Sequence, residues 1–210
     1  MIPALTELLN GFAVSFDLPI LDWIQAHLQS GFMDKVMPII TMFGDDGIFW
    51  IACAAILLLF PKQRRTGLGM GIALLMGLVV CNMILKPVVQ RIRPYDFQEQ
   101  VNGVIIPMLV SGLSDFSFPS GHTIASFEAS VALLRGNKKL GIPALILAFL
   151  IAFSRLYLYV HYPTDVIFSI FLGTAFAFIG YGLAGKIVKP PRKGKYEAEL
   201  SSPVLNWQCP

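Results

Sequence analysis

The residues best suited to chemistry begin with His122, which follows Pro119, Ser120 and Gly121 where a polar stretch gives way to a long apolar run. Proline is common in the first turn of a helix, so we expect a helix to start at Pro119. The backbone N–H groups of Ser120 and Gly121 would then be free at its N-terminus, where the helix dipole also attracts anions. An imidazole beside them adds a titratable proton donor. The segment therefore predicts an anion-binding site with an acid next to it.

A second segment with cations, residues 86–94, lies at the end of another apolar run. Lys86 and Arg93 are seven positions apart, so a continuous helix would place both on one face, unless Pro87 bends it. The segment predicts two positive charges close to each other.

The third segment, residues 154–165, contains Arg155, His161 and Asp165. Pro163 keeps His161 and Asp165 from lying on one regular helix, but a turn would still bring the carboxylate to the imidazole. An imidazole held by a carboxylate keeps one tautomer with one nitrogen free to attack, and a second histidine can protonate a leaving oxygen.

Together the three segments supply three cations, two histidines and one carboxylate. Arginine and lysine bind phosphate oxygens, and phosphoryl transfer requires positive charge around the phosphorus together with a nucleophile and an acid. No second carboxylate or cysteine is expected to join this set, so the sequence predicts neither a metal site nor a cofactor. Each segment alone also has a structural interpretation, because Lys and Arg at helix ends reach the membrane interface, where Tyr157, Tyr159 and Tyr162 would form an aromatic belt.

These segments belong to an apolar chain of 210 residues, 55% hydrophobic and 14% charged. Soluble domains carry about 25% charged residues, so we predict an all-α integral-membrane helical bundle. Glycines 67, 69, 71 and 77 would let one helix approach its neighbours closely, and two adjacent aspartates would break another at residues 44–47. Apolar runs indicate five transmembrane helices, at residues 36–60, 67–86, 119–134, 140–160 and 165–185.

Three regions follow from this pattern. Residues 1–30 form an apolar N-terminal segment, with an amphipathic helix that starts near Asp17 and lies in the membrane interface, or alternatively with a sixth spanning helix. Residues 31–186 form the transmembrane catalytic domain, and residues 187–210 form a basic, disordered tail. Residues 1–34 contain no Lys or Arg, which argues against a cleaved signal peptide.

The basic residues predict the orientation in the membrane. Eleven of the 16 Lys and Arg residues lie in the loops at residues 61–65 and 135–139 and in residues 186–195. The alternation of spans places these on one side, which the positive-inside rule identifies as cytoplasmic, so the three candidate segments face the extracytoplasmic side. His122 lies thirteen residues before Arg135, roughly 20 Å of helix against a hydrocarbon core of about 30 Å, so the site would be recessed.

One carboxyl and three thiols remain outside these segments. Glu128 lies at membrane depth six positions after His122 and on a different helical face, and it is either a functional group or a buried structural hydrogen-bonding group. Cys53 and Cys81 lie in apolar runs and are interpreted as core thiols, and Cys209 as a thiol of the tail.

The three segments read Lys-x6-Arg-Pro, Pro-Ser-Gly-His and Ser-Arg-x5-His-x3-Asp. This pattern resembles, at every position, the signature of the type 2 phosphatidic acid phosphatase (PAP2) family, which is shared with the soluble vanadium haloperoxidases. The resemblance covers residues 86–165 directly. It implies a phosphohistidine on His161, oriented by Asp165, with His122 as the acid for the leaving group. It further implies that the phosphoryl oxygens are held by Lys86, Arg93, Ser120, the Gly121 N–H and Arg155.

We therefore expect a metal-independent lipid phosphate phosphatase at the extracytoplasmic face, with the lipid and the bilayer as its partners and no nucleic acid. The substrates implied by the resemblance are phosphatidic acid, phosphatidylglycerol phosphate and undecaprenyl diphosphate; the sequence does not choose among them, nor does it give the oligomeric state. Two alternatives remain. One is a lipid phosphotransferase that uses the same histidine, and the other is a non-catalytic anion-binding membrane protein, which would need polar residues continuing across the bilayer.

Overall fold

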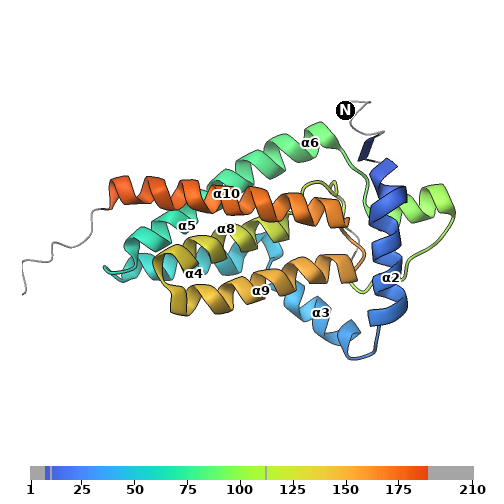
Figure 1. Cartoon of the computed structure of the whole chain (residues 1–210), viewed down its shortest axis with the longest axis horizontal. Helices are drawn as coiled ribbons and strands as arrows, with labels where there is room; N and C mark the ends of the chain where they lie inside the picture. The colour runs from blue at the N-terminus through green and yellow to red at the C-terminus, as the bar shows by residue number, and fades with distance from the viewer. Residues whose placement is uncertain (1–7, 10, 112, 189–210) are drawn as a thin grey trace, which may run out of the picture.

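The computed structural model describes residues 8–9, 11–111 and 113–188, and every regular element in this part of the chain is helical (Figure 1). The predicted tail beyond residue 188, with Cys209, lies outside the described residues, as do the first seven. The elements are, in chain order, η1 Ala13–Asp17, α2 Leu18–Leu28, α3 Met33–Met42, η2 Asp45–Gly47, α4 Ile48–Leu59, α5 Arg64–Gly77, η3 Leu78–Leu85, α6 Lys86–Val89, α7 Pro94–Phe97, η4 Gln98–Asn102, α8 Gly121–Gly136, α9 Lys138–Tyr157 and α10 Pro163–Ile187.

Four helical stretches of the described chain are long and apolar enough to cross a membrane: Met33–Leu59, Arg64–Asn102, Lys138–Tyr157 and Pro163–Ile187. The remaining expected span, at residues 119–134, corresponds to α8, which has 16 residues, about 24 Å of helix against a hydrocarbon core of about 30 Å. The count of five spans is therefore not confirmed. α8 packs against α5, α9 and α10 and is buried along most of its length, so its small and polar side chains contact protein.

The start of α8 differs from the expected one. The helix begins at Gly121, and Ser120 is an extended N-cap with ψ 107°. Pro119 therefore lies before the helix and not in its first turn. The free N–H groups of a first turn consequently begin at Gly121.

The first membrane-length stretch is broken where the sequence predicts. α3 ends at Met42 and α4 begins at Ile48, with η2 between them. Asp46 and Gly47 both have positive φ, 49° and 66°, which a right-handed helix cannot accommodate. The break brings a polar turn into the bundle.

In the second stretch, the helix runs through α5, the π-helical η3 and α6 and is interrupted after Val89. Gln90 is left-handed, with φ 52°. Arg93 is extended, with ψ 154°, because the ring of Pro94 disfavours the helical conformation in the residue before it. The expectation that Lys86 and Arg93 lie on one helical face is therefore wrong.

Three glycines bring α5 against three different helices. A side chain on Gly67 would collide with α4, and one on Gly69 would collide with the backbone of α10. Gly77 makes room for the carboxyl of Glu128 on α8. The expected close approach is thus confirmed at these three positions, whereas a Cβ on Gly71 would meet nothing within 4 Å.

The bundle has two distinct ends. α2 lies across the end at which α9 stops and α10 begins, and it does not run along the bundle as a sixth span would (Figure 1). The α4–α5 and α8–α9 connections and the last turn of α10 lie at the opposite end, where Arg65 and Arg135 contact the ring of Tyr181. The basic loops therefore share one end, and the side of the membrane that this end faces stays a prediction.

Candidate active site

A cavity of about 780 Å³ collects side chains from all three sequence segments. Six of the predicted site residues line it, namely Lys86, Arg93, Gly121, His122, Arg155 and His161. Ser120 and Asp165 are fully buried behind this lining. The cavity continues between α4 and α5, where its walls are apolar or small: Ile51, Ala54, Gly71, Leu74, Leu75 and Leu78.

His161 lies in the turn between α9 and α10, and its side chain is 2% exposed. Tyr159, with a left-handed φ of 59°, turns the chain before it. Nε2 of the imidazole lies 3.4 Å from Arg93 Nη1, one of the cavity cations. Nδ1 lies 3.6 Å from Asp165 Oδ2, which is longer than a hydrogen bond. The carboxylate therefore stands behind the ring, and Nε2 is the nitrogen next to the cations.

Burial and the surrounding cations favour a neutral imidazole at His161. Desolvation, followed by the positive charges of Arg93, Arg155 and Lys86, lowers its pKa well below the usual 6.5. A neutral imidazole keeps the lone pair that a nucleophile needs at pH 7.

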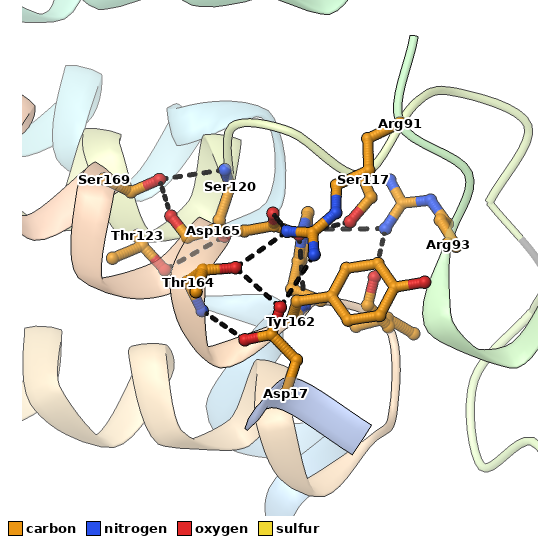
Figure 2. A network of polar contacts seen from close by, with 12 residues as sticks. Asp17, Arg91, Arg93, Ser117, Ser120, Thr123, Tyr162, Thr164, Asp165 and Ser169 are labelled. Carbon is orange, nitrogen blue, oxygen red and sulfur yellow. Dashed lines mark hydrogen bonds and ion pairs between the residues drawn. The ribbon is translucent and has the colours of Figure 1, made fainter. Parts of the chain in front are cut away.

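Asp165 is the third residue of α10, which begins at Pro163, so Pro163 separates the carboxylate from His161 as predicted. The carboxylate accepts hydrogen bonds from Arg91, from the Ser117 hydroxyl and, at 3.1 Å, from the Tyr162 N–H. Figure 2 shows these donors around the start of α10. A buried carboxylate needs such donors, because it has no contact with water.

His122 contacts a carboxylate that the sequence analysis did not place in the site. Its Nε2 lies 2.7 Å from Asp45 Oδ1, in the break between α3 and α4. Gly44 permits this approach, because a Cβ there would lie 2.6 Å from the imidazole. The expectation of a single carboxylate is therefore wrong. The adjacent aspartates of the break were the signal that could have indicated this partner.

Asp115 is a further carboxylate that sequence reasoning missed. It pairs with Lys86 and, at 2.5 Å, with Arg93 Nη2. The two cations are therefore brought together by a shared carboxylate and not by a continuous helix. Burial alone would raise its pKa, but hydrogen bonds and charges from Lys86 and Arg93 outweigh burial and lower the pKa to about 2. Arg155, the third cation, donates to Thr41 Oγ1 of α3 at 2.6 Å. The two cations that Asp115 joins are suited to bind phosphoryl oxygens in its place.

Ser120 and Gly121 differ in what they offer an anion. The Ser120 N–H donates to Ser169 Oγ at 2.9 Å, and its hydroxyl pairs with Thr123 Oγ1 at 2.9 Å (Figure 2). The expectation of a free Ser120 N–H is therefore not met. Gly121 lines the cavity, and none of the described side chains caps α8, so the first-turn N–H groups are available to an anion.

Glu128 also lines the cavity, about 9 Å farther along α8 than His122. It is 1% exposed, and its Oε1 has no hydrogen-bond partner among the described residues. Cys53 and Cys81 are free thiols. Among the described residues, no group of three or more His, Cys, Asp or Glu side chains is arranged to hold a metal ion.

The support behind Asp165 was also missed. Arg91 follows Lys86 in the same basic segment, but its spacing does not distinguish it from a cation at the membrane surface. In the sequence, Asp17 indicates only the start of a helix. In the structure both are buried and form an ion pair at 2.7 Å, which only the packing of distant segments could produce.

Comparisons with known proteins agree with this geometry. A family model described as the PAP2 superfamily matches residues 66–189. Undecaprenyl-diphosphatase of Sulfolobus acidocaldarius is 32% identical over 152 residues, 72% of this chain and 70% of that protein. Undecaprenyl-diphosphatase BcrC of Bacillus subtilis is 31% identical over 147 residues, 70% of this chain and 72% of that protein. A solved structure described as the first transmembrane PAP2 type phosphatidylglycerolphosphate phosphatase, from Bacillus subtilis, has a TM-score of 0.69 and 28% identity, covering 89% of this chain and 93% of that one.

Proposed function

Because the chain belongs to the PAP2 superfamily and is a multi-pass membrane phosphatase, we propose that it removes phosphate from a lipid through a phosphohistidine on His161, without a metal ion. The observation that carries the proposal is one cavity that holds two imidazoles and three cations, with a carboxylate behind His161. Phosphoryl transfer needs such a nucleophile, an acid and positive charge around the phosphorus.

The reaction has two steps. In the first, His161 Nε2 attacks the terminal phosphorus, and the bond from this phosphorus to the leaving oxygen breaks. The leaving oxygen is the bridging oxygen in a lipid diphosphate and the lipid oxygen in a phosphomonoester, and protonated His122 gives its proton to it. In the second, His122 takes a proton from water, the water oxygen attacks the phosphorus, and the N–P bond breaks. Inorganic phosphate leaves, and both imidazoles return to their starting forms. Asp45 orients His122 in both steps.

The phosphoryl oxygens would be bound by the three cations, Lys86, Arg93 and Arg155, and by the Gly121 N–H. Phosphate would take the place of the Asp115 carboxylate on Lys86 and Arg93, so these cations exchange one anion for another. Ser120 would contribute by holding the start of α8 against Ser169, because its own N–H is already used.

The substrate we place first is undecaprenyl diphosphate, since two relatives are named for that activity. Phosphatidylglycerol phosphate and phosphatidic acid follow. The apolar part of the cavity between α4 and α5 suits a hydrocarbon chain that stays in the bilayer. Because the basic connections lie at the end opposite the α9–α10 turn that carries His161, the positive-inside rule supports a site on the extracytoplasmic side.

The test is phosphate release in detergent with EDTA, from a panel of these three lipids. The wild type is compared with His161→Ala and with His27→Ala, whose imidazole is exposed and stacks on Trp23. We expect release to survive EDTA, to persist in His27→Ala and to vanish in His161→Ala. Acid-labile phosphate should be trapped on the wild type and on His27→Ala, but not on His161→Ala. Release that requires a metal ion, or that survives in His161→Ala, would contradict the mechanism. Transfer of the phosphate to an acceptor lipid would identify the phosphotransferase alternative.

A further inference from the structure

Behind the catalytic pair, one guanidinium lies between two buried carboxylates (Figure 2). Arg91 Nη2 lies 2.7 Å from Asp17 Oδ2, and Nη1 donates to Asp165 Oδ1. Arg91 is 2% exposed and both carboxylates are 0% exposed. The Tyr162 ring covers the guanidinium at 3.8 Å. A charged group this buried is retained only where its partners are fixed.

Neither Arg91 nor Asp17 belongs to the cavity lining in the described part of the chain. They therefore do not reach a phosphoryl group bound there. They can affect the reaction only through Asp165. Arg91 contacts Oδ1 of this carboxylate, and Oδ2 faces His161 Nδ1.

We propose that Arg91 and Asp17 are positioning residues for the reaction: Arg91 fixes the orientation and charge of Asp165 behind His161, and Asp17 fixes Arg91. This inference rests on the proposed role of His161 as nucleophile. It assigns a function to the N-terminal segment, which supplies Asp17 although it lies outside the signature segments.

Asp17 also holds the helix that carries Asp165. Its Oδ1 accepts the Thr164 N–H at 2.9 Å, and its Oδ2 accepts the Thr164 hydroxyl at 2.7 Å. The Thr164 hydroxyl in turn lies 2.8 Å from Arg91 Nη1. Asp17 thus caps the start of α10 and also pairs with the Arg91 guanidinium. Its carboxylate therefore joins the N-terminal segment, the 91–93 segment and α10.

The charges that act on His161 come from several elements. Asp165 stands behind it, and Arg93, Arg155 and Lys86 lower its pKa. Removing the cation at Arg91 leaves the charge of Asp165 less compensated, which favours the protonated imidazole. Removing the Asp17 carboxylate leaves the Arg91 charge to compensate Asp165 without the competing Asp17 charge. The better compensated Asp165 favours the neutral imidazole. The two changes therefore move the titration of His161 in opposite directions.

The experiment compares Arg91→Gln, Arg91→Lys and Asp17→Asn with the wild type, using Asp34→Asn as the matched control. Asp34 accepts a hydrogen bond from the Tyr157 hydroxyl, and among the described residues it has no hydrogen bond or ion pair with Arg91, Thr164 or Asp165. Folding is checked by thermal unfolding and gel filtration in detergent. Phosphate release gives kcat, KM and the acidic limb of the pH–rate profile, and NMR follows the His161 imidazole directly.

We expect Arg91→Gln to lower kcat by about 10²-fold with KM unchanged, and to move the acidic limb and the imidazole titration to higher pH. Arg91→Lys keeps the charge and restores part of kcat, Asp17→Asn moves the titration to lower pH, and Asp34→Asn resembles the wild type. Folded variants with unshifted titrations, or with shifts in the same direction, would overturn the proposal, since a merely structural role moves neither. If Arg91→Gln does not fold, Arg91→Lys and Asp17→Asn decide.

The imidazole titration also separates the two proposals. A wild type that releases no phosphate contradicts the proposed function, whereas the opposite shifts of the His161 titration would still be observed if the positioning pair exists.

Discussion

Asp115 pairs with both Lys86 and Arg93 at the cavity, and its side chain is 48% exposed while that of Arg93 is 2% exposed. A phosphoryl group that binds these cations has to displace the carboxylate. Ion pairs between exposed groups contribute about 1 kcal/mol or less, and water screens the half-exposed Asp115 carboxylate, so the exchange is energetically accessible. Asp115 would then neutralise the buried Arg93 guanidinium between turnovers and compete with the substrate phosphate for Lys86 and Arg93.

Asp115→Asn should therefore tighten the binding of inorganic phosphate or vanadate as inhibitors by up to about fivefold, the equivalent of one such ion pair. The measurement is the inhibition constant in the phosphate-release assay at constant ionic strength. Asp96→Asn, a change of the same kind in α7, serves as control and should leave the constant unaltered. An unchanged or weaker inhibition constant in Asp115→Asn would show that the carboxylate does not compete.

At the scale of elements, α5 is the helix that sets the spacing of the bundle. Gly67, Gly69 and Gly77 place it against α4, α10 and α8 in turn, and the π-helical η3 continues it to the cations of the site. π-helical turns are frequent at functional sites. The continuous helical stretch α5–η3–α6 thus packs against three helices through α5 and carries Lys86 at the start of α6.

Gly69→Ala should lower the free energy of unfolding by about 1–3 kcal/mol, because the new Cβ would lie 2.9 Å from Tyr181 Cα and the two backbones must separate. Gly71→Ala is the matched control on the same helix. It meets nothing within 4 Å and should stabilise the helix by about 0.5–1 kcal/mol. Thermal unfolding in detergent compares the two. A Gly69→Ala protein as stable as Gly71→Ala would mean that the close crossing of α5 and α10 is not required.

At the scale of the whole molecule, polar and apolar parts of one cavity are separated along the bundle. The turn between α9 and α10, which carries His161, lies at the end crossed by α2 (Figure 1). The cations and His122 line the same part of the cavity as His161. The walls of the other part, between α4 and α5, are apolar or small apart from the Glu128 carboxyl beside Gly77. This division suits a substrate with a charged head and a hydrocarbon chain.

Gly71→Trp should fill the apolar part and raise KM for a long-chain lipid phosphate about tenfold, the equivalent of two lost CH2 contacts. Hydrolysis of p-nitrophenyl phosphate, which has no chain, should be unaffected. Gly182→Trp is the control, because Gly182 on α10 has open space around it and lies outside the cavity lining. Equal effects of Gly71→Trp on both substrates would place the lipid chain elsewhere.

Local signals in the sequence predicted the class of fold and most of the side chains that line the cavity. The apolar composition indicated a membrane helical bundle, and the paired aspartates and Pro163 marked a break and a helix start that the structure contains. Six of the eight named site residues line one cavity. These predictions succeed because hydrophobic runs, proline and glycine act on the few residues next to them.

The partners of these residues were decided only by the tertiary structure. Asp45 and His122 are 77 residues apart, and Arg91 is 74 residues from both Asp17 and Asp165. No spacing rule applies at such separations, because packing of helices and not chain geometry brings the groups together. The same holds for α8, whose central burial is set by α5, α9 and α10 around it. The sequence by itself determined which residues could act on a phosphate, and the fold decided which carboxylates lie against the histidines and against Lys86 and Arg93.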